Sequence, residues 1–179
     1  SFNSSKLVTV WAGFSTKWYG ELLRDEAFLN AAWVTIKVAV ISSTFATVLG
    51  TMAAYVLVNS GRFFGRTLFS GMIYAPLVMP EVITGLSLLL LFIGMGLDRG
   101  ILTIVLAHTT FSMCYVSVVV SSRLVSFDRS LEEAALDLGC NRFDAFRLVT
   151  LPIIAPAVIS GWLLAFTLSL DDLVTASFV

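Results

Sequence analysis

The sequence predicts an all-α protein made of several membrane-spanning helices joined by polar links. Hydrophobic residues make up 58% of the 179 residues, charged residues only 13%, and the mean hydropathy is +0.92. An ordinary soluble domain is about 45–50% apolar and about 25% charged, so this chain has too little polar surface for a soluble fold. Its apolar stretches are long enough to cross a hydrocarbon core of ~30 Å as helices. The chain is therefore predicted to be an integral membrane protein.

Four candidate spans follow one another along the chain. They lie at about 27–58, 67–95, 101–122 and 152–170. A transmembrane β-strand would be about ten residues long and would alternate apolar and polar side chains. The run 86–93 does not alternate, so we predict helices for the spans and a polytopic helix bundle.

The distribution of arginine predicts which links face the cytoplasm, because cytoplasmic loops retain positive charge. The link 59–66 carries two arginines and no acidic residue, whereas the link 94–100 balances one arginine with one aspartate. We therefore expect the link 59–66 and the segment 129–151 to be cytoplasmic, and both ends of this chain to be extracytoplasmic. The arginines on the predicted cytoplasmic side are Arg62, Arg66, Arg123, Arg129, Arg142 and Arg147.

The two ends of the sequence predict further membrane helices. The chain begins at Ser1 without a methionine and without the basic, apolar and small-residue regions of a signal peptide. An exported N-terminal segment normally follows a membrane span or a cleaved signal, and the C-terminal end stops shortly after the fourth span. We expect a single transmembrane domain, 1–179, that lacks a first and a last helix.

The polar segment 129–151 begins with the pattern of a short capped helix. Ser130 and Glu133 have the spacing of a capping box, in which each side chain bonds the other residue's backbone N–H. The helix is predicted to run to Leu138. Gly139 then stands where a left-handed residue would end it, a conformation that glycine adopts without steric cost.

A second short helix is predicted directly after this turn. Asn141 is placed to cap a helix over 142–149, and three apolar side chains recur on it at helical spacing. These are Phe143, Phe146 and Val149. This stripe either packs beneath the protein's own bundle or docks on a partner in the aqueous phase, and the pattern alone leaves both open.

At these residues the sequence resembles a known family. The segment is similar to the EAA loop of membrane permeases in binding-protein-dependent ABC importers. The shared pattern is Glu-Ala-Ala, three residues, Gly, nine residues, an aliphatic residue, one residue and Leu-Pro. The residues that match are Glu133, Ala134, Ala135, Gly139, Leu151 and Pro152, while Val149 replaces the usual isoleucine. The resemblance covers essentially the whole chain. The flanks 1–4 and 169–172 are most similar to the spermidine/putrescine permeases, especially the putrescine type.

The resemblance implies a type I importer permease whose hairpin, 129–151, is a coupling helix seated in a groove of an ATPase. Closure of two ATPase subunits would switch the pathway between outward and inward access. The implied coupling residues are Glu133, Ala134, Ala135, Gly139, Phe143 and Phe146. The sequence lacks the Gly-x-x-x-x-Gly-Lys-Ser/Thr phosphate loop. We therefore expect a transport subunit without catalytic residues or a cofactor of its own, with ATP and Mg²⁺ on its partners.

The same resemblance implies the partners and the location. They are a second permease subunit, two ATPase subunits, a periplasmic substrate-binding protein and the lipid of a bacterial inner membrane. Nucleic acid is not an expected partner, because the net charge is −1 and phosphate neutralisation needs clustered Lys and Arg.

Acidic residues supply the candidates for a cation pathway. Glu81 follows Pro80 and interrupts the second apolar span, where an ionisable group is costly and usually faces a partner or water. Glu81 therefore either lines a path for cations or is a buried acid with a structural role, and the sequence leaves both open. Asp171 and Asp172 present the same choice between a substrate contact and a solvated interfacial acid.

Trp18 is the aromatic candidate. Alkylammonium ligands are held by carboxylates together with aromatic faces, and such a cation–π contact contributes roughly 0.5–2 kcal/mol. Tryptophan is also an ordinary membrane-interface anchor. The resemblance to polyamine permeases favours Trp18 and Asp172 as substrate contacts, and leaves both putrescine and spermidine as candidate cargoes.

Two other functions remain as alternatives. An importer permease for another small solute would share every feature above. An ion-coupled secondary transporter would use Glu81 and His108 as coupling groups, although the sequence contains no internal repeat. We expect His108 to be a hydrogen-bonded interior residue, and no metal site, because the cysteines and the single histidine have no ligand spacing.

Overall fold

The computed structural model describes residues 3, 11, 13–61 and 63–179. These residues divide into two compact units, Ser1–Lys37 and Val38–Val179. Ser1, Phe2 and Ser4 of the N-terminal flank, and Arg62 of the charged link, lie outside the described residues. Within the described residues the ordered elements are helices, with one isolated bridge between Asn3 and Phe14.

The first unit contains α1 (Lys17–Leu22) and the start of α2 (Glu26–Asn59), which contributes residues to both units. Asp25 precedes α2, and its carboxylate accepts hydrogen bonds from the N–H groups of Ala27 and Phe28 at 3.0 and 3.2 Å. This is the usual N-terminal capping of a helix by a short acidic side chain.

Three helices among the described residues are long and apolar enough to cross a membrane. They are α2, α5 (Ile101–Val125) and a continuous run, Arg142–Asp171, that includes α8 (Leu151–Asp171). The pair α3 (Arg66–Val78) and α4 (Glu81–Gly94) would make a fourth span if counted together. Length and composition therefore place helices at each of the four predicted spans.

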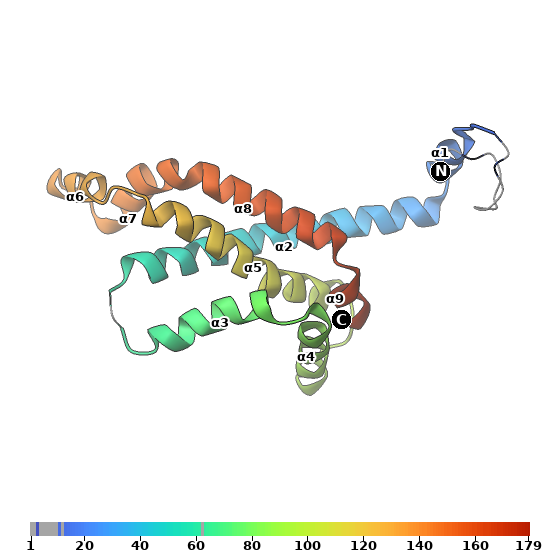
Figure 1. Cartoon of the computed structure of the whole chain (residues 1–179), viewed down its shortest axis with the longest axis horizontal. Helices are drawn as coiled ribbons and strands as arrows, with labels where there is room; N and C mark the ends of the chain where they lie inside the picture. The colour runs from blue at the N-terminus through green and yellow to red at the C-terminus, as the bar shows by residue number, and fades with distance from the viewer. Residues whose placement is uncertain (1–2, 4–10, 12, 62) are drawn as a thin grey trace. The chain divides into compact units, whose positions relative to one another are not determined.

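The second predicted span, 67–95, is not one helix. Its two halves meet at a bend of 120°, visible between α3 and α4 in Figure 1. Met79 is extended, with φ −76° and ψ 138°. Because the residue before a proline avoids the α conformation and Pro80 has no N–H to donate, α3 ends at Val78 and α4 starts at Glu81.

The core of the second unit lies where α5 packs against α2 and α8 (Figure 1). Val116 on α5 is fully buried between Gly50 on α2 and Gly161 on α8. A methyl group added at Gly50 would lie 2.7 Å from the carbonyl oxygen of Met113, and one added at Gly161 would lie 3.2 Å from Val116 Cγ1. Small residues therefore allow these helix backbones to approach closely.

The chain breaks direction after α8 and ends in α9 (Leu173–Phe178), which packs on α4. An added methyl group at Gly85 on α4 would lie 2.9 Å from a ring carbon of Phe178. Thr103 at the start of α5 donates a hydrogen bond to the carbonyl oxygen of Val179 at 2.8 Å. These contacts fix α9 against α4 and α5.

Candidate functional site

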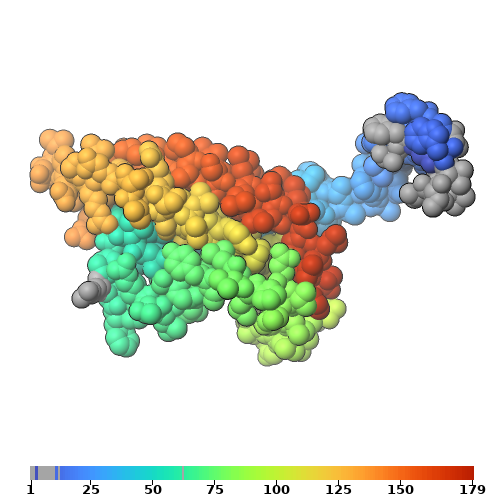
Figure 2. Space-filling model, viewed as in Figure 1, coloured from blue at the N-terminus to red at the C-terminus, as the bar shows by residue number. Residues whose placement is uncertain are grey.

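The segment predicted as a hairpin begins with α6 (Ser130–Asp137), which forms one end of the second unit (orange in Figure 2). The predicted capping box is wrong. Ser130 is already helical and donates its N–H to the Asp128 carboxylate at 3.0 Å, while the Glu133 N–H bonds the carbonyl of Arg129. Because Ser130 donates hydrogen bonds to its carboxylate, the pKa of Asp128 is lower than usual.

The turn after α6 is confirmed. Gly139 has φ +92°, and the N–H of Cys140 bonds the carbonyl of Ala135 at 3.1 Å, which is the Schellman arrangement. The cap of α7 (Arg142–Ala145) is confirmed too. The Asn141 side chain accepts from the Asp144 N–H at 2.8 Å and donates to the Asp144 carboxylate at 2.6 Å.

The second short helix does not end at Val149 as predicted. It passes through a π-helical turn, η1 (Phe146–Thr150), directly into α8, so that Arg142–Asp171 is one run. Pro152 explains the wide turn, because in a regular α-helix its ring would clash with the carbonyl four residues earlier. The second half of the hairpin is therefore continuous with the last span.

Glu132 fastens this hairpin to the bundle. Its carboxylate accepts hydrogen bonds from the Tyr55 hydroxyl on α2 at 3.0 Å and from the Thr150 hydroxyl at 3.2 Å. The Tyr55 ring also meets the Phe146 ring edge-on, with centroids 4.8 Å apart. Sequence reasoning missed Glu132. The available signal was its position three residues before Ala135, which is buried, on the same face of α6.

The opposite face of the hairpin is open. Glu133, Ala134 and Gly139 are exposed, and the Phe143 side chain is 69% exposed. A groove of about 760 Å³ lies between the end of α2 and the helices α6 and α7. The predicted coupling residues thus divide into Ala135 and Phe146, which pack inward, and the other four, which are exposed.

The four proposed substrate contacts belong to two units, and each is placed within its own unit. Trp18 belongs to the first unit, where its indole N–H donates to the carbonyl of Asn3 at 2.6 Å. Glu81 is exposed in the first turn of α4, and Asp171 is exposed at the end of α8.

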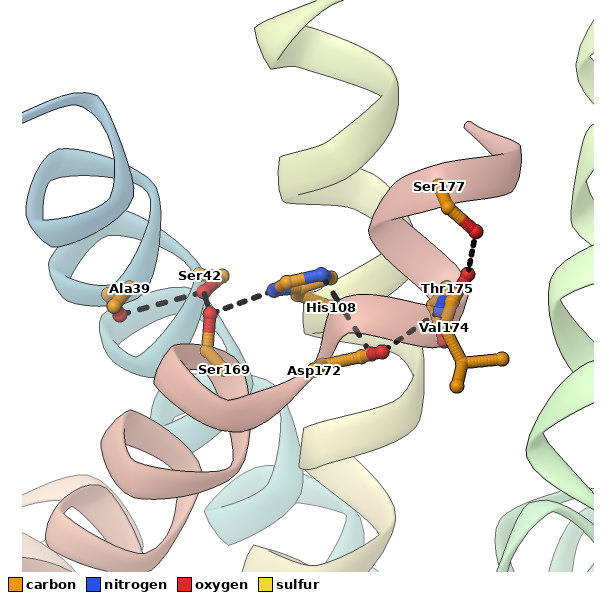
Figure 3. Close-up of polar contacts among 8 residues, drawn as sticks. All are labelled: Ala39, Ser42, His108, Ser169, Asp172, Val174, Thr175 and Ser177. Atoms are coloured by element: carbon orange, nitrogen blue, oxygen red, sulfur yellow. Dashed lines mark hydrogen bonds and ion pairs between the residues drawn. The ribbon is translucent and has the colours of Figure 1, made fainter. Parts of the chain in front are cut away.

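Asp172 instead belongs to a buried polar cluster (Figure 3). One carboxylate oxygen accepts from the Thr175 N–H at 2.8 Å and caps α9, and the other lies 3.6 Å from His108 Nε2. His108 Nδ1 is 2.6 Å from the Ser169 hydroxyl, which is 3.1 Å from the Ser42 hydroxyl. The expectation of a hydrogen-bonded interior His108 is confirmed, since its side chain is 3% exposed.

This cluster connects α2, α5, α8 and α9 at the point where the chain leaves α8. The described residues contain no group of three or more His, Cys, Asp or Glu side chains that would hold a metal ion. The hydrogen bonds among Ser42, His108 and Ser169 make the cluster an interhelical polar network, in which His108 Nε2 has only its 3.6 Å contact with Asp172.

Replacing Ser169 with alanine should lower the free energy of unfolding by about 1–2 kcal/mol, because Ser42 and His108 both lose their shared partner. The measurement is the apparent Tm of the full-length protein in mild detergent. Ser160→Ala is the control, since its exposed hydroxyl bonds only a carbonyl of α8 itself. Equal Tm values for the two variants would contradict a stabilising role for the cluster.

Comparisons with known proteins agree with this architecture. Residues 46–179 match the family described as "Binding-protein-dependent transport system inner membrane component". The chain is 64% identical over its whole length to the putrescine transport system permease protein PotI of Escherichia coli K12, covering 66% of that protein. It is 43% identical to the spermidine/putrescine transport system permease protein PotC of the same organism, covering 67%. It thus spans about two thirds of each relative's length.

A solved structure shares the fold. An amino acid ABC transporter chain superposes with a TM-score of 0.68 at 18% identity, covering 92% of this chain and 77% of that one. At this identity the likeness shows the arrangement of helices.

Proposed function

Because the chain belongs to the family of binding-protein-dependent transport system inner membrane components, we propose that it is a permease subunit of an ATP-driven polyamine importer. The observation that carries the proposal is the Glu-Ala-Ala hairpin, with Glu133 and Ala134 exposed, in a chain 64% identical to a putrescine permease. The implied assembly contains a second permease subunit, two ATPase subunits that bind ATP and Mg²⁺, and a periplasmic binding protein. The hairpin and the link 59–66 face the cytoplasm, and both ends of this chain face the opposite side.

The hairpin is suited to transmit force from a soluble partner to the membrane helices. Phe143 offers an exposed apolar side chain to a groove, and Glu133 offers a charge beside it. Glu132 and Phe146 hold the inner face against Tyr55. A movement imposed on α7 passes into α8 without an intervening loop. The ATPase would therefore act on the pathway through this continuous helix.

The proposed cargo is a cation, putrescine or spermidine. Glu81 and Asp171 present exposed carboxylates that could pair with ammonium groups, and Trp18 offers an aromatic face. Asp172 is 10% exposed, and its hydrogen bond from Thr175 and its contact with His108 make its carboxylate less accessible to a substrate than that of Asp171. We place Asp171 and Glu81 nearest the moving substrate, with Asp172 orienting the start of α9.

Co-purification of the full-length permease with its ATPase tests the proposal. Phe143→Asp should reduce recovery of the ATPase about tenfold or more, because a buried apolar contact becomes an unpaired charge. Phe64→Asp is the matched control, since Phe64 is fully exposed on the other predicted cytoplasmic link.

Putrescine-stimulated ATP hydrolysis in the reconstituted assembly should fall in parallel with Phe143→Asp and persist with Phe64→Asp. Full recovery of the ATPase together with normal stimulation in Phe143→Asp would count against the coupling role. Stimulation by an unrelated solute, and not by putrescine or spermidine, would instead redirect the cargo assignment while leaving the coupling role in place.

A further inference from the structure

A second cavity, of about 390 Å³, lies where the end of α2 meets α3 and the end of α5. We call it the arginine pocket. Its polar lining comes from Arg66, Arg129, Ser70, Tyr74 and Ser121, and its remaining walls are aliphatic. Its volume is in the range of small-ligand sites. No coupling or substrate residue named above lines it.

Both arginines donate hydrogen bonds to backbone carbonyls at the end of α2, and these bonds use only some of the guanidinium N–H groups. Arg66 donates to the carbonyls of Gly61 and Leu57 at 3.2 and 2.9 Å, and Arg129 donates to the carbonyl of Val58 at 2.7 Å. These bonds satisfy carbonyls at a helix C-terminus, an ordinary structural use of arginine. Each guanidinium carries five N–H donors, so most of the donors remain available.

The pocket lining has positive charge and no carboxylate, although Arg129 also lines the neighbouring groove with Glu132 and Glu133. None of its lining residues is acidic, and among the described residues neither guanidinium lies within ion-pair distance of an Asp or Glu. Helix capping alone does not require two cations to face one cavity. Two cations close together in a cavity repel each other unless an anion is present.

The neutral polar groups of the pocket are also donors. The Ser121 hydroxyl is buried and has no hydrogen-bond partner among the described residues. Buried hydroxyls are normally bonded, and an unpaired one costs about 1–3 kcal/mol. The hydroxyls of Ser70 and Tyr74 line the same space. The two guanidinium groups and these hydroxyl groups match an anion with several acceptor oxygens, such as a phosphate group.

The surroundings identify the source of that phosphate. The pocket lies at the ends of two candidate membrane spans, α2 and α5. One wall, Val125, is 73% exposed, and Leu68 on α3 is 70% exposed. Basic pockets between transmembrane helices take the headgroups of anionic lipids, whose chains then lie along apolar helix surfaces. We propose that the arginine pocket binds the phosphate headgroup of an anionic phospholipid, a function separate from the transport role above.

Native mass spectrometry of the full-length protein, in complex with its partners, tests this site with dioleoylphosphatidylglycerol as the probe. Ser70→Asp places a carboxylate in the pocket and leaves both arginines and their bonds to α2 intact. It should weaken binding of one phosphatidylglycerol about tenfold. The control, Ser126→Asp, adds the same charge at an exposed residue outside the pocket lining and should bind as the wild type does.

A second pair of variants removes charge. Arg66→Gln with Arg129→Gln should lose the same lipid, whereas Arg123→Gln with Arg147→Gln should retain it, because those arginines are exposed and outside the pocket. Equal affinity in the pocket and control variants would overturn the proposal. So would equal binding of dioleoylphosphatidylcholine. Displacement of the lipid by excess inorganic phosphate would assign the pocket to a free anion and overturn the lipid assignment.

Discussion

Replacing Gly50 with valine is expected to destabilise the protein by about 3 kcal/mol, because it drives a side chain into the backbone of α5. A single added methyl group would already lie 2.7 Å from the carbonyl oxygen of Met113 and 2.8 Å from Val116 Cβ. The Met113 carbonyl belongs to a helix and cannot rotate away as a flexible side chain would. Val116 cannot move either, since Gly161 closes its other side.

The measurement is the apparent Tm of the full-length protein in detergent, together with the fraction recovered as a single monodisperse species. Gly71→Val is the matched control. Gly71 also lies inside a helix, α3, but an added methyl group there meets nothing within 4 Å. The change in helix propensity is similar at both positions, so the difference in Tm reports the interhelical contact. A Tm as high for Gly50→Val as for Gly71→Val would show that α2 and α5 are not closely packed.

Replacing Glu132 with alanine is expected to loosen the hairpin and to uncouple it from the membrane helices. The Tyr55 and Thr150 hydroxyls both lose a charged acceptor, and a hydrogen bond to a charged group contributes about 1.5–3 kcal/mol. We expect a lower Tm and a loss of most putrescine-stimulated ATP hydrolysis in the reconstituted assembly.

Glu133→Ala separates the two roles of this acidic pair. Glu133 is exposed, so its removal should leave the Tm unchanged while weakening the response to the ATPase. Insertion into the membrane should be normal in both variants. A lowered Tm in Glu133→Ala with an unchanged Tm in Glu132→Ala would reverse the assignment of the inner and outer acid.

Local sequence signals predicted the parts of the structure that depend on local chemistry. Long apolar stretches located the candidate spans, Gly139 located the left-handed turn, and Asn141 located the start of α7. Each follows from a residue's own conformational or hydrogen-bonding preference. Glu81 and the preceding Pro80 interrupt the apolar character of the second span, but that span was predicted as one segment and its bend of 120° was not predicted.

The features that sequence reasoning missed depend on which of several possible partners a side chain takes, whether the partner is near in the sequence or far from it. Glu132 and Tyr55 are separated by 77 positions, so the local signal, the helix face that Glu132 shares with Ala135, does not identify Tyr55 as its partner. The capping box failed because Asp128, two residues earlier, already accepts the Ser130 N–H. The bond by which Asp172 caps α9 is local, but its contact with His108 was missed because His108 lies on another helix.

Under the proposed coupling role, the unbroken run from Arg142 to Asp171 would act as a lever, with the contact of Gly161 and Val116 as its pivot. At 1.5 Å per residue, the arm on the hairpin side is about 28 Å long and the arm toward Asp171 about 15 Å. A stroke of about 2 Å at the hairpin would therefore arrive as about 1 Å at Asp171, with roughly twice the force. This ratio would suit a soluble ATPase that moves the hairpin over a large distance and must separate tightly packed membrane helices by a small one.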